Sequence, residues 1–186
     1  KNSLWESNQL WIYCKIFRLL GAQRVKKGVR NVTFFGDTGF MYKCNLALRT
    51  AIKILKPIAS FKVINEKDLY DKIYKIKWEN YIDQTSTIAI NSTVHSNKFT
   101  HSQYISLKAK DAIVDRIRSI SGERPSVDLK FPDLKINIHI DKLFCNISLD
   151  SSGESLHKRG YKTATNIAPI NEVLAAGLVM LSGWEG

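Results

Sequence analysis

Three segments in the second half of the chain alternate between apolar and polar residues. They are residues 87–94, 134–140 and 143–149, and each carries an apolar side chain at about every second position. This period of two is typical of a β-strand with one buried face. Residues 134–140 and 143–149 are separated by only two residues, which predicts a β-hairpin. Residues 59–64 form a further apolar run and are expected to be a strand.

Two other segments carry the spacing of a helix. Residues 103–121 place their apolar side chains within one stripe, and Gly122 follows as a capping residue. Residues 66–76 repeat this pattern over a shorter length, with Asn65 as the expected N-cap. Arg116 lies only about 30° from the centre of the longer stripe. Because an unpaired buried guanidinium is costly, we expect Arg116 to form an ion pair.

The two ends of the chain have less regular patterns. Residues 10–20 are apolar with basic interruptions, which suits a helix. A turn and then a strand within residues 29–35 are expected next, followed by a helix over residues 41–55 that Pro57 stops. Near the C-terminus, an Ala-Pro pair opens a helix over residues 168–183.

The order of the elements predicts the fold class and the organisation of the chain. After Pro57 the order is strand, helix, strand, helix, strand, strand, which indicates an α+β layer with its helices on one face of a sheet. We expect a small α+β unit over residues 1–57, a second unit over residues 58–150 and a C-terminal segment over residues 151–186. The C-terminal helix is strongly apolar and too short to cross a bilayer, so a partner domain is expected to cover it.

The charge of the chain is concentrated at one end. The formal net charge is +11, and residues 1–62 contain twelve Lys and Arg against two acids, whereas the remainder has sixteen bases and fifteen acids. A one-sided basic surface suits a polyanionic partner such as nucleic acid, because neutralised phosphates release condensed counterions. The alternative is that the excess of basic residues only keeps the chain in solution.

The cysteines and histidines argue against two kinds of site. Cys14, Cys44 and Cys145 are far apart and odd in number, so we expect buried thiols in place of a disulfide framework or a zinc site. The four histidines are scattered, and no metal site is predicted. No apolar run reaches the length of about 18 residues that a membrane span needs, and no secretory signal is present. We therefore expect no membrane association and a cytoplasmic location.

Three tracts of the chain resemble a known family. They are SQYISLKAKDAIVD at residues 102–115, KINIHIDKLFCNISLD at residues 135–150, and a tail in two pieces. The tail is the most specific part, since it reads LDSSGESLHKRGYK at residues 149–162 and APINEVLAAGLVMLSGW at residues 168–184. From about Gly21 onward the chain is similar to the large-subunit (23S) ribosomal RNA guanine-N2 methyltransferases that carry an N-terminal THUMP domain.

The resemblance implies a fold and a reaction. The implied fold is a THUMP domain with a ferredoxin-like N-terminal subdomain, helices packed on a mixed sheet, and a C-terminal helix that belongs to a Rossmann-like methyltransferase domain beyond the chain. The cofactor loop and the catalytic motif of the family do not occur in the sequence, and residues 1–16 depart from the family's pattern. We therefore expect the full-length protein to be an enzyme that uses S-adenosylmethionine, and this chain alone to hold no cofactor and to be non-catalytic.

The resemblance also implies that structured RNA is the partner. In such enzymes the THUMP module binds RNA through its shape and backbone, which requires cations and polar groups. The candidate residues are Lys98, His101, Ser102, Lys108, Lys110, Arg124, Lys158 and Arg159.

Each group of candidates has a simpler interpretation as well. At the start of the long helix, backbone N–H groups favour a phosphate, but Ser102 could instead be the N-cap of the helix itself. Lys108 and Lys110 could be solvated surface cations. Arg124 could pair with an acid such as Asp128. The basic tract that contains Lys158 could dock against the methyltransferase domain.

Three functions are compatible with the sequence. The first is RNA binding and substrate positioning for a methyltransferase that acts on the exocyclic amine of guanine in large-subunit ribosomal RNA, with the downstream catalytic domain as a second partner. The second is the THUMP module of a transfer-RNA-modifying enzyme, against which the tail tract argues. The third is a non-catalytic ferredoxin-like module that binds protein. RNA binding with a steep salt dependence favours the first, and salt-independent capture of a protein favours the third.

Overall fold

A computed structural model describes residue 14 and residues 16–28, 31–83, 85–160 and 169–184. Contacts between residues divide the chain into two compact units. Unit 2 is the continuous stretch Leu55–Asp150, whereas unit 1 combines Lys1–Ile54 with Ser151–Gly186.

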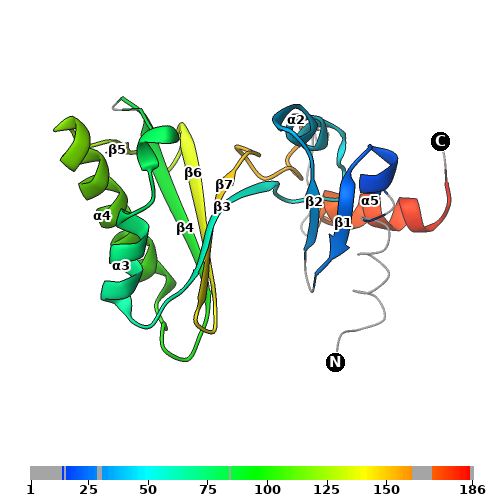
Figure 1. Cartoon of the computed structure of the whole chain (residues 1–186). Helices are drawn as coiled ribbons and strands as arrows, with labels where there is room; N and C mark the ends of the chain where they lie inside the picture. Colours follow the sequence, from blue (N-terminus) through cyan, green and yellow to red (C-terminus); the bar gives the residue numbers. More distant parts are fainter. Residues whose placement is uncertain (1–13, 15, 29–30, 84, 161–168, 185–186) are drawn as a thin grey trace. The chain divides into compact units, whose positions relative to one another are not determined.

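A five-stranded mixed sheet forms the centre of unit 2 (Figure 1). Its strands are, in spatial order, β3 (Leu55–Lys62), β7 (Phe144–Asp150), β6 (Leu134–Asp141), β4 (Thr87–His95) and β5 (Ser126–Val127). β7 is antiparallel to both of its neighbours, and β4 is parallel to both of its neighbours. The mixed sheet that the resemblance implied is confirmed.

Two helices cover one face of this sheet (Figure 1). They are α3 (Glu66–Tyr74) and α4 (Ser102–Ser121), and the short 3-10 helix η1 (Trp78–Asn80) follows α3. Alternate strand residues such as Ile138 and Ile147 are fully buried in the core of this unit. Burying a side chain of this size contributes about 1.5–3 kcal/mol, so this layer is the main source of stability in unit 2.

Local signals in the sequence position the helices of unit 2. Asn65 caps α3, because its Oδ1 accepts a hydrogen bond from the backbone N–H of Asp68 at 2.8 Å. α4 ends at Gly122, whose φ of 78° is the left-handed conformation that glycine adopts most readily. The Arg116 guanidinium donates to the Glu79 carboxylate at 2.7 Å. The expected N-cap, C-terminal glycine and ion pair are all confirmed.

Unit 1 contains a two-stranded antiparallel sheet and helices. The strands are β1 (Gln23–Lys27) and β2 (Val32–Phe35), and the helices include α2 (Thr38–Ala47) and α5 (Glu172–Leu181). The helix expected over residues 10–20 is helical at residues 14 and 16–19, and its first part lies outside the described residues. Among the described residues, the hydrophobic core of this unit contains the buried side chains of Phe17, Cys44, Leu48, Ile54 and Leu156.

The segment that follows β7 packs into unit 1. The backbone N–H of Ser151 donates to the carbonyl of Ile54 at 3.0 Å, and that of Leu156 donates to the carbonyl of Ile52 at 2.9 Å. The Leu156 side chain is only 9% exposed. Unit 2 is therefore an insertion between two parts of unit 1.

Some expected elements near Pro57 are wrong. The helix expected over residues 41–55 ends at Ala47, and β3 begins at Leu55 and runs through Pro57. A proline is tolerated at this point because β3 is an edge strand with a register shift after Pro57. The turn expected between the first helix and residue 29 contains β1. The sequence of β1, QRVKK, is mostly exposed and lacks the apolar alternation of a buried strand.

The thiols of Cys44 and Cys145 are buried, as expected. Burial raises the pKa of Cys44 to about 11 and that of Cys145 to about 12. The third cysteine, Cys14, is half-buried. Within the described part of the chain, no helix has the length and apolar character of a membrane span, and no three His, Cys, Asp or Glu side chains are grouped around a potential metal position.

Candidate nucleic-acid interface

The start of α4 is the clearest anion-binding feature of unit 2. After β4 ends at His95, the chain turns through Lys98 to His101, which is the N-cap of α4. The first turn of α4, which lies wholly within the described residues, carries no acidic residue and no side-chain cap. Its backbone N–H groups and the helix dipole therefore favour an external anion such as a phosphate. The start of α3, by contrast, has the Asn65 cap and two acidic residues.

The three candidates at this helix start are all exposed. Ser102 is the first residue of α4 and His101 precedes it as the N-cap, so the interpretation in which Ser102 caps the helix is wrong. The carbonyl of Ser102 accepts a hydrogen bond from Ser92 Oγ, which also pairs with Ser106 Oγ at 2.8 Å. These bonds fix the start of α4 to β4 and hold the candidate side chains at the surface.

The turn of the β6–β7 hairpin lies beside the end of β4, where the segment that leads to this helix start begins. The backbone N–H of Lys142 donates to the carbonyl of His95 at 2.8 Å, and Ser96 Oγ donates to the carbonyl of Lys142. The turn residues are Lys142 and Leu143, one position later than expected. Lys142 therefore joins Lys98 at one end of the unit. Sequence reasoning missed Lys142. Its place in the predicted hairpin loop indicated an exposed cation, but only the pairing of β6 with β4 brings it near Lys98.

Two other candidates make contacts within unit 2 along α4. Lys108 Nζ lies 5.2 Å from the centre of the Tyr70 ring, and Lys110 Nζ lies 3.0 Å from Asp111 Oδ1. The Tyr70 hydroxyl donates to Asp115 Oδ2 at 2.6 Å, and this hydrogen bond, together with burial, raises the pKa of Tyr70 to about 12. Lys108 and Lys110 are half-buried and locally engaged, so they are weaker candidates than Lys98.

Arg124 is far from the start of α4. It is exposed in the loop that follows the helix, and the 20 residues of α4 span about 30 Å. Its expected acidic partner, Asp128, accepts hydrogen bonds from the backbone N–H groups of Lys130 and Phe131 at 2.8 and 3.1 Å. Arg124 and Lys98 therefore cannot contact the same phosphate.

Lys158 and Arg159 belong to unit 1, and their environments differ. Lys158 is exposed. The half-buried Arg159 donates to three backbone carbonyls: Nε bonds to Leu156 at 2.7 Å, and Nη2 bonds to Asn45 at 2.7 Å and to Leu48 at 2.9 Å. Asn45 and Leu48 lie at the C-terminal end of α2, where carbonyl groups lack partners within the helix. This geometry favours a structural role for Arg159.

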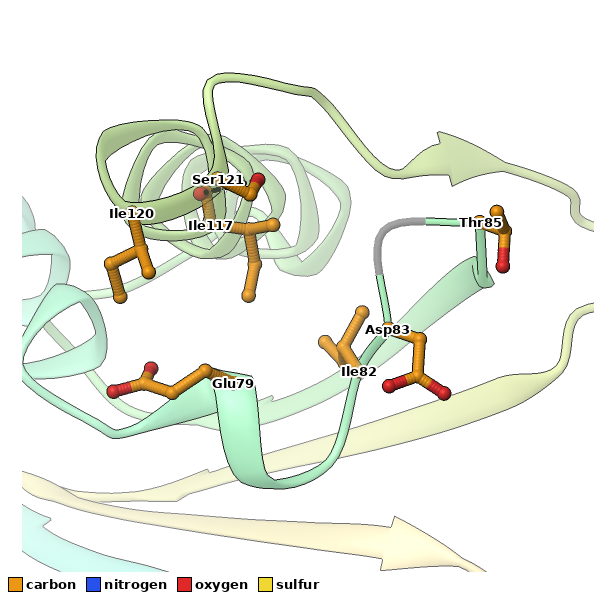
Figure 2. A pocket seen from close by; sticks show the side chains of 7 residues that line it. All are labelled: Glu79, Ile82, Asp83, Thr85, Ile117, Ile120 and Ser121. Carbon is orange, nitrogen blue, oxygen red and sulfur yellow. Dashed lines mark hydrogen bonds between the residues drawn. The ribbon is translucent and has the colours of Figure 1, made fainter.

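A hollow of about 430 Å³ lies between η1 and the C-terminal part of α4 (Figure 2). Its lining residues are Glu79, Ile82, Asp83, Thr85, Ile117, Ile120 and Ser121. The hydrogen bond from Arg116 holds the pKa of Glu79 below its usual range, so this carboxylate stays charged. With two carboxylates and no basic residue in its lining, the hollow does not suit a phosphate.

Two family profiles match successive parts of the chain. The RlmL ferredoxin-like domain matches residues 17–55, and the THUMP domain matches residues 63–150. Residues 63–150 are a THUMP domain. The ferredoxin-like match ends where unit 1 gives way to unit 2, and the THUMP match covers all of unit 2 except β3.

Relatives share both the THUMP domain and the region before it. The Synechocystis sp. protein slr0064 is 43% identical over 89% of this chain, which covers 43% of that protein. The ribosomal RNA large subunit methyltransferase K/L of Aeromonas hydrophila is 41% identical over 90% of this chain, which covers 23% of that protein. The structure of SMU.472 complexed with SAH matches with a TM-score of 0.82 and 29% identity, covering 95% of this chain and 47% of that one. The chain therefore spans less than half of each of these homologues.

Proposed function

We propose that this chain binds structured RNA, with large-subunit ribosomal RNA as the target, and positions it for an S-adenosylmethionine-dependent methyltransferase domain of the same protein. The observation that carries the proposal is a THUMP domain whose long helix starts with an acid-free, uncapped turn beside Lys98 and Lys142. Relatives named as ribosomal RNA large subunit methyltransferases K/L support the choice of target. The SAH in the SMU.472 structure supports the choice of cofactor.

The reaction proposed for the full-length protein methylates the exocyclic amine of a guanine. The lone pair of that nitrogen forms the new N–C bond while the C–S bond of the sulfonium breaks, and the nitrogen then loses a proton. The residues of this chain contribute by holding the RNA, because a correctly placed base reacts in an effectively unimolecular step. The target base must also leave its stack to reach the catalytic domain.

The candidates divide into a primary contact and peripheral ones. Lys98, His101, Ser102 and Lys142 make up the primary phosphate contact, since they surround one helix start and one hairpin turn. Arg124 and Lys158 are exposed elsewhere and are assigned to other parts of a large RNA. Arg159, Lys108 and Lys110 are not assigned to RNA, because each has a partner within its own unit.

The test is the salt dependence of RNA binding by charge-matched variants. The double variant Lys98→Ala, Lys142→Ala should bind a large-subunit ribosomal RNA stem-loop about tenfold more weakly. The slope of its log affinity against log salt concentration should be smaller by the equivalent of about two phosphate contacts. The control is Lys75→Ala, Lys77→Ala, which removes the same charge from exposed positions at and after the C-terminal end of α3. An equal loss of affinity in both double variants would show that binding depends only on net charge and would contradict the proposed interface.

A non-catalytic, protein-binding function is the second candidate. It is favoured by the apolar side chains that α5 exposes, which are Leu174, Leu178, Val179, Met180 and Leu181. Such a patch marks either a docking surface for another domain or a site for a separate protein. Salt-independent association with a protein, without binding to ribosomal or transfer RNA, would favour this alternative. If the chain does bind RNA, competition between ribosomal RNA and transfer RNA for binding to it shows which of the two is the target.

A further inference from the structure

The face of the THUMP sheet opposite α3 and α4 has an unusual composition. In β4, β6 and β7 the exposed or half-buried residues that alternate with the core residues are mostly amides, hydroxyls and imidazoles: Asn91, Thr93, His95, Asn137, His139 and Asn146. None of the helices that the structure describes in unit 2 packs on this face (Figure 1). Asparagine is depleted in strands, yet three of these strand residues are asparagines on one face. Sheet stability alone does not explain this choice.

The strand register brings these groups into rows across the sheet. One row runs Ser60, Asn146, His139 and Thr93, since each of these residues is paired with the next. Ser60 Oγ donates to Asn146 Oδ1 at 2.7 Å. The rings of His95 and His139 lie 5.7 Å apart in an edge-to-face arrangement. The row therefore presents hydrogen-bond donors and acceptors next to two planar rings.

An exposed aromatic residue borders these rows. Phe144 is 57% exposed, and its register partners are Lys62 on one side and Asp141 on the other. Its neighbour Cys145 is buried toward the helices, so Phe144 lies on the open face. A flat apolar ring beside a lysine offers a surface for stacking and a charge for a phosphate.

We propose that this open face, defined by Asn137, His139, Phe144 and Asn146, binds unpaired RNA nucleotides. Unpaired bases need ring faces for stacking and side chains that hydrogen-bond to their edges, and an open sheet is a suitable platform for about two or three of them. A double helix hides its base faces and presents mainly phosphates and 2′-hydroxyls. The carboxylates of Asp141 and Asp150 lie on the same face and would repel the phosphate-lined surface of a double helix.

The inference rests on the proposed function and specifies which part of the RNA the chain recognises. The helix start with Lys98 holds the backbone of the folded RNA. The open face selects RNA that has a loop, bulge or end beside that backbone contact. The chain therefore prefers a stem with unpaired nucleotides to a fully paired stem.

The experiment measures the affinity of the full chain for three RNAs by fluorescence anisotropy. They are a ribosomal stem-loop, a blunt duplex with the same stem, and an unstructured dodecamer. The variant Phe144→Ala should bind the stem-loop and the dodecamer at least about fivefold more weakly than the parent and leave duplex binding unchanged. The control is Phe131→Ala, which removes a phenylalanine that is 80% exposed in the loop before β6 and should leave all three affinities unchanged.

A second variant and a cross-link extend the experiment. His139→Ala should act in the same direction as Phe144→Ala, and circular dichroism should show that both variants keep the parental spectrum. A 5-iodouridine dodecamer should cross-link to the peptide that contains Phe144. If the parent binds the stem-loop but the Phe144 and His139 variants match it on every RNA, the inference fails and the proposed function stands. If the parent binds none of the three RNAs, the proposed function fails and the inference fails with it.

Discussion

Arg159 shows how one residue can serve a role that its charge does not reveal. It stands in the basic tract HKR, yet its guanidinium donates to carbonyls at and after the end of α2. The last turn of α2 has no basic residue of its own, so Arg159 supplies the cation that the negative end of the helix dipole favours. A planar fork of donors suits this task better than a lysine ammonium.

We predict that Arg159→Ala lowers the free energy of unfolding of unit 1 by about 2 kcal/mol. The reason is that hydrogen bonds to charged groups contribute about 1.5–3 kcal/mol, and their loss leaves carbonyls without partners. Chemical denaturation followed by circular dichroism measures the change. Lys158→Ala, at the exposed neighbouring position, should remain within about 0.5 kcal/mol of the parent. Equal effects of the two substitutions would contradict the structural role of Arg159.

At the scale of elements, the loop before β6 is fixed to β4 by one carboxylate. Asp133 Oδ2 accepts hydrogen bonds from the backbone N–H of Thr87 at 2.7 Å and from Thr87 Oγ1 at 2.8 Å. The backbone N–H of Asp133 donates to Thr87 Oγ1 at 3.0 Å. These bonds lie where the parallel strands β4 and β6 both begin, so they hold the two strands in register.

The bonds from Thr87 keep the pKa of Asp133 below its usual range, which predicts a pH dependence. A carboxyl group with a lowered folded-state pKa stabilises the fold above its unfolded pKa of about 3.9, and this contribution is lost as the pH falls through the folded-state pKa. Asp133→Asn should therefore be less stable than the parent at pH 7, and the difference should shrink below about pH 4. Thermal unfolding between pH 2.5 and 7 tests this. A difference that stays constant over that range would contradict the assignment, and Thr87→Val should reproduce part of the effect.

At the scale of the whole molecule, unit 2 is inserted into unit 1 at adjacent points. Leu55 is paired with Asp150 in the sheet, and the backbone N–H of Ser151 donates to the carbonyl of Ile54. Ser152 Oγ also accepts a hydrogen bond from the Ile54 N–H at 2.8 Å. Insertions whose ends meet are tolerated because each part keeps its own core.

The insertion predicts that each unit folds without the other. A chain in which Ile54 is joined to Ser151 by a short glycine-serine linker should unfold cooperatively, and so should the isolated fragment 55–150. The fragment 1–54 alone should be less structured, because it lacks the core residue Leu156 and the Arg159 contacts. Circular dichroism and amide hydrogen exchange measure these differences. A fragment 1–54 as stable as the joined chain would show that the C-terminal segment is not part of this unit.

The sequence by itself determined the α+β class of unit 2, its two α-helices and the strands β4, β6 and β7, but not the start of β3 or the short elements η1 and β5. The alternation over residues 87–94 and 134–149 and the stripe of residues 103–121 are strong because one face of each element is buried against the same core. The N-cap Asn65 and the C-terminal Gly122 could also be predicted from the sequence, since capping depends on neighbouring residues only. The resemblance, which rested on short tracts, added the THUMP identity.

Only the tertiary structure decided which basic residues lie together and which are already engaged. The eight candidates look alike in the sequence. In the structure, Lys98, His101 and Ser102 cluster at the start of α4, Lys108 and Lys110 make local contacts further along it, Arg124 lies about 30 Å away, and Lys158 and Arg159 belong to the other unit. Lys142 joins the cluster because its backbone N–H bonds to the carbonyl of His95, which is 47 positions away in the sequence. Arg159 is already engaged, because its guanidinium bonds to the carbonyl of Asn45, which is 114 positions away. Such contacts follow from the packing of distant segments, and no local pattern of residues encodes them.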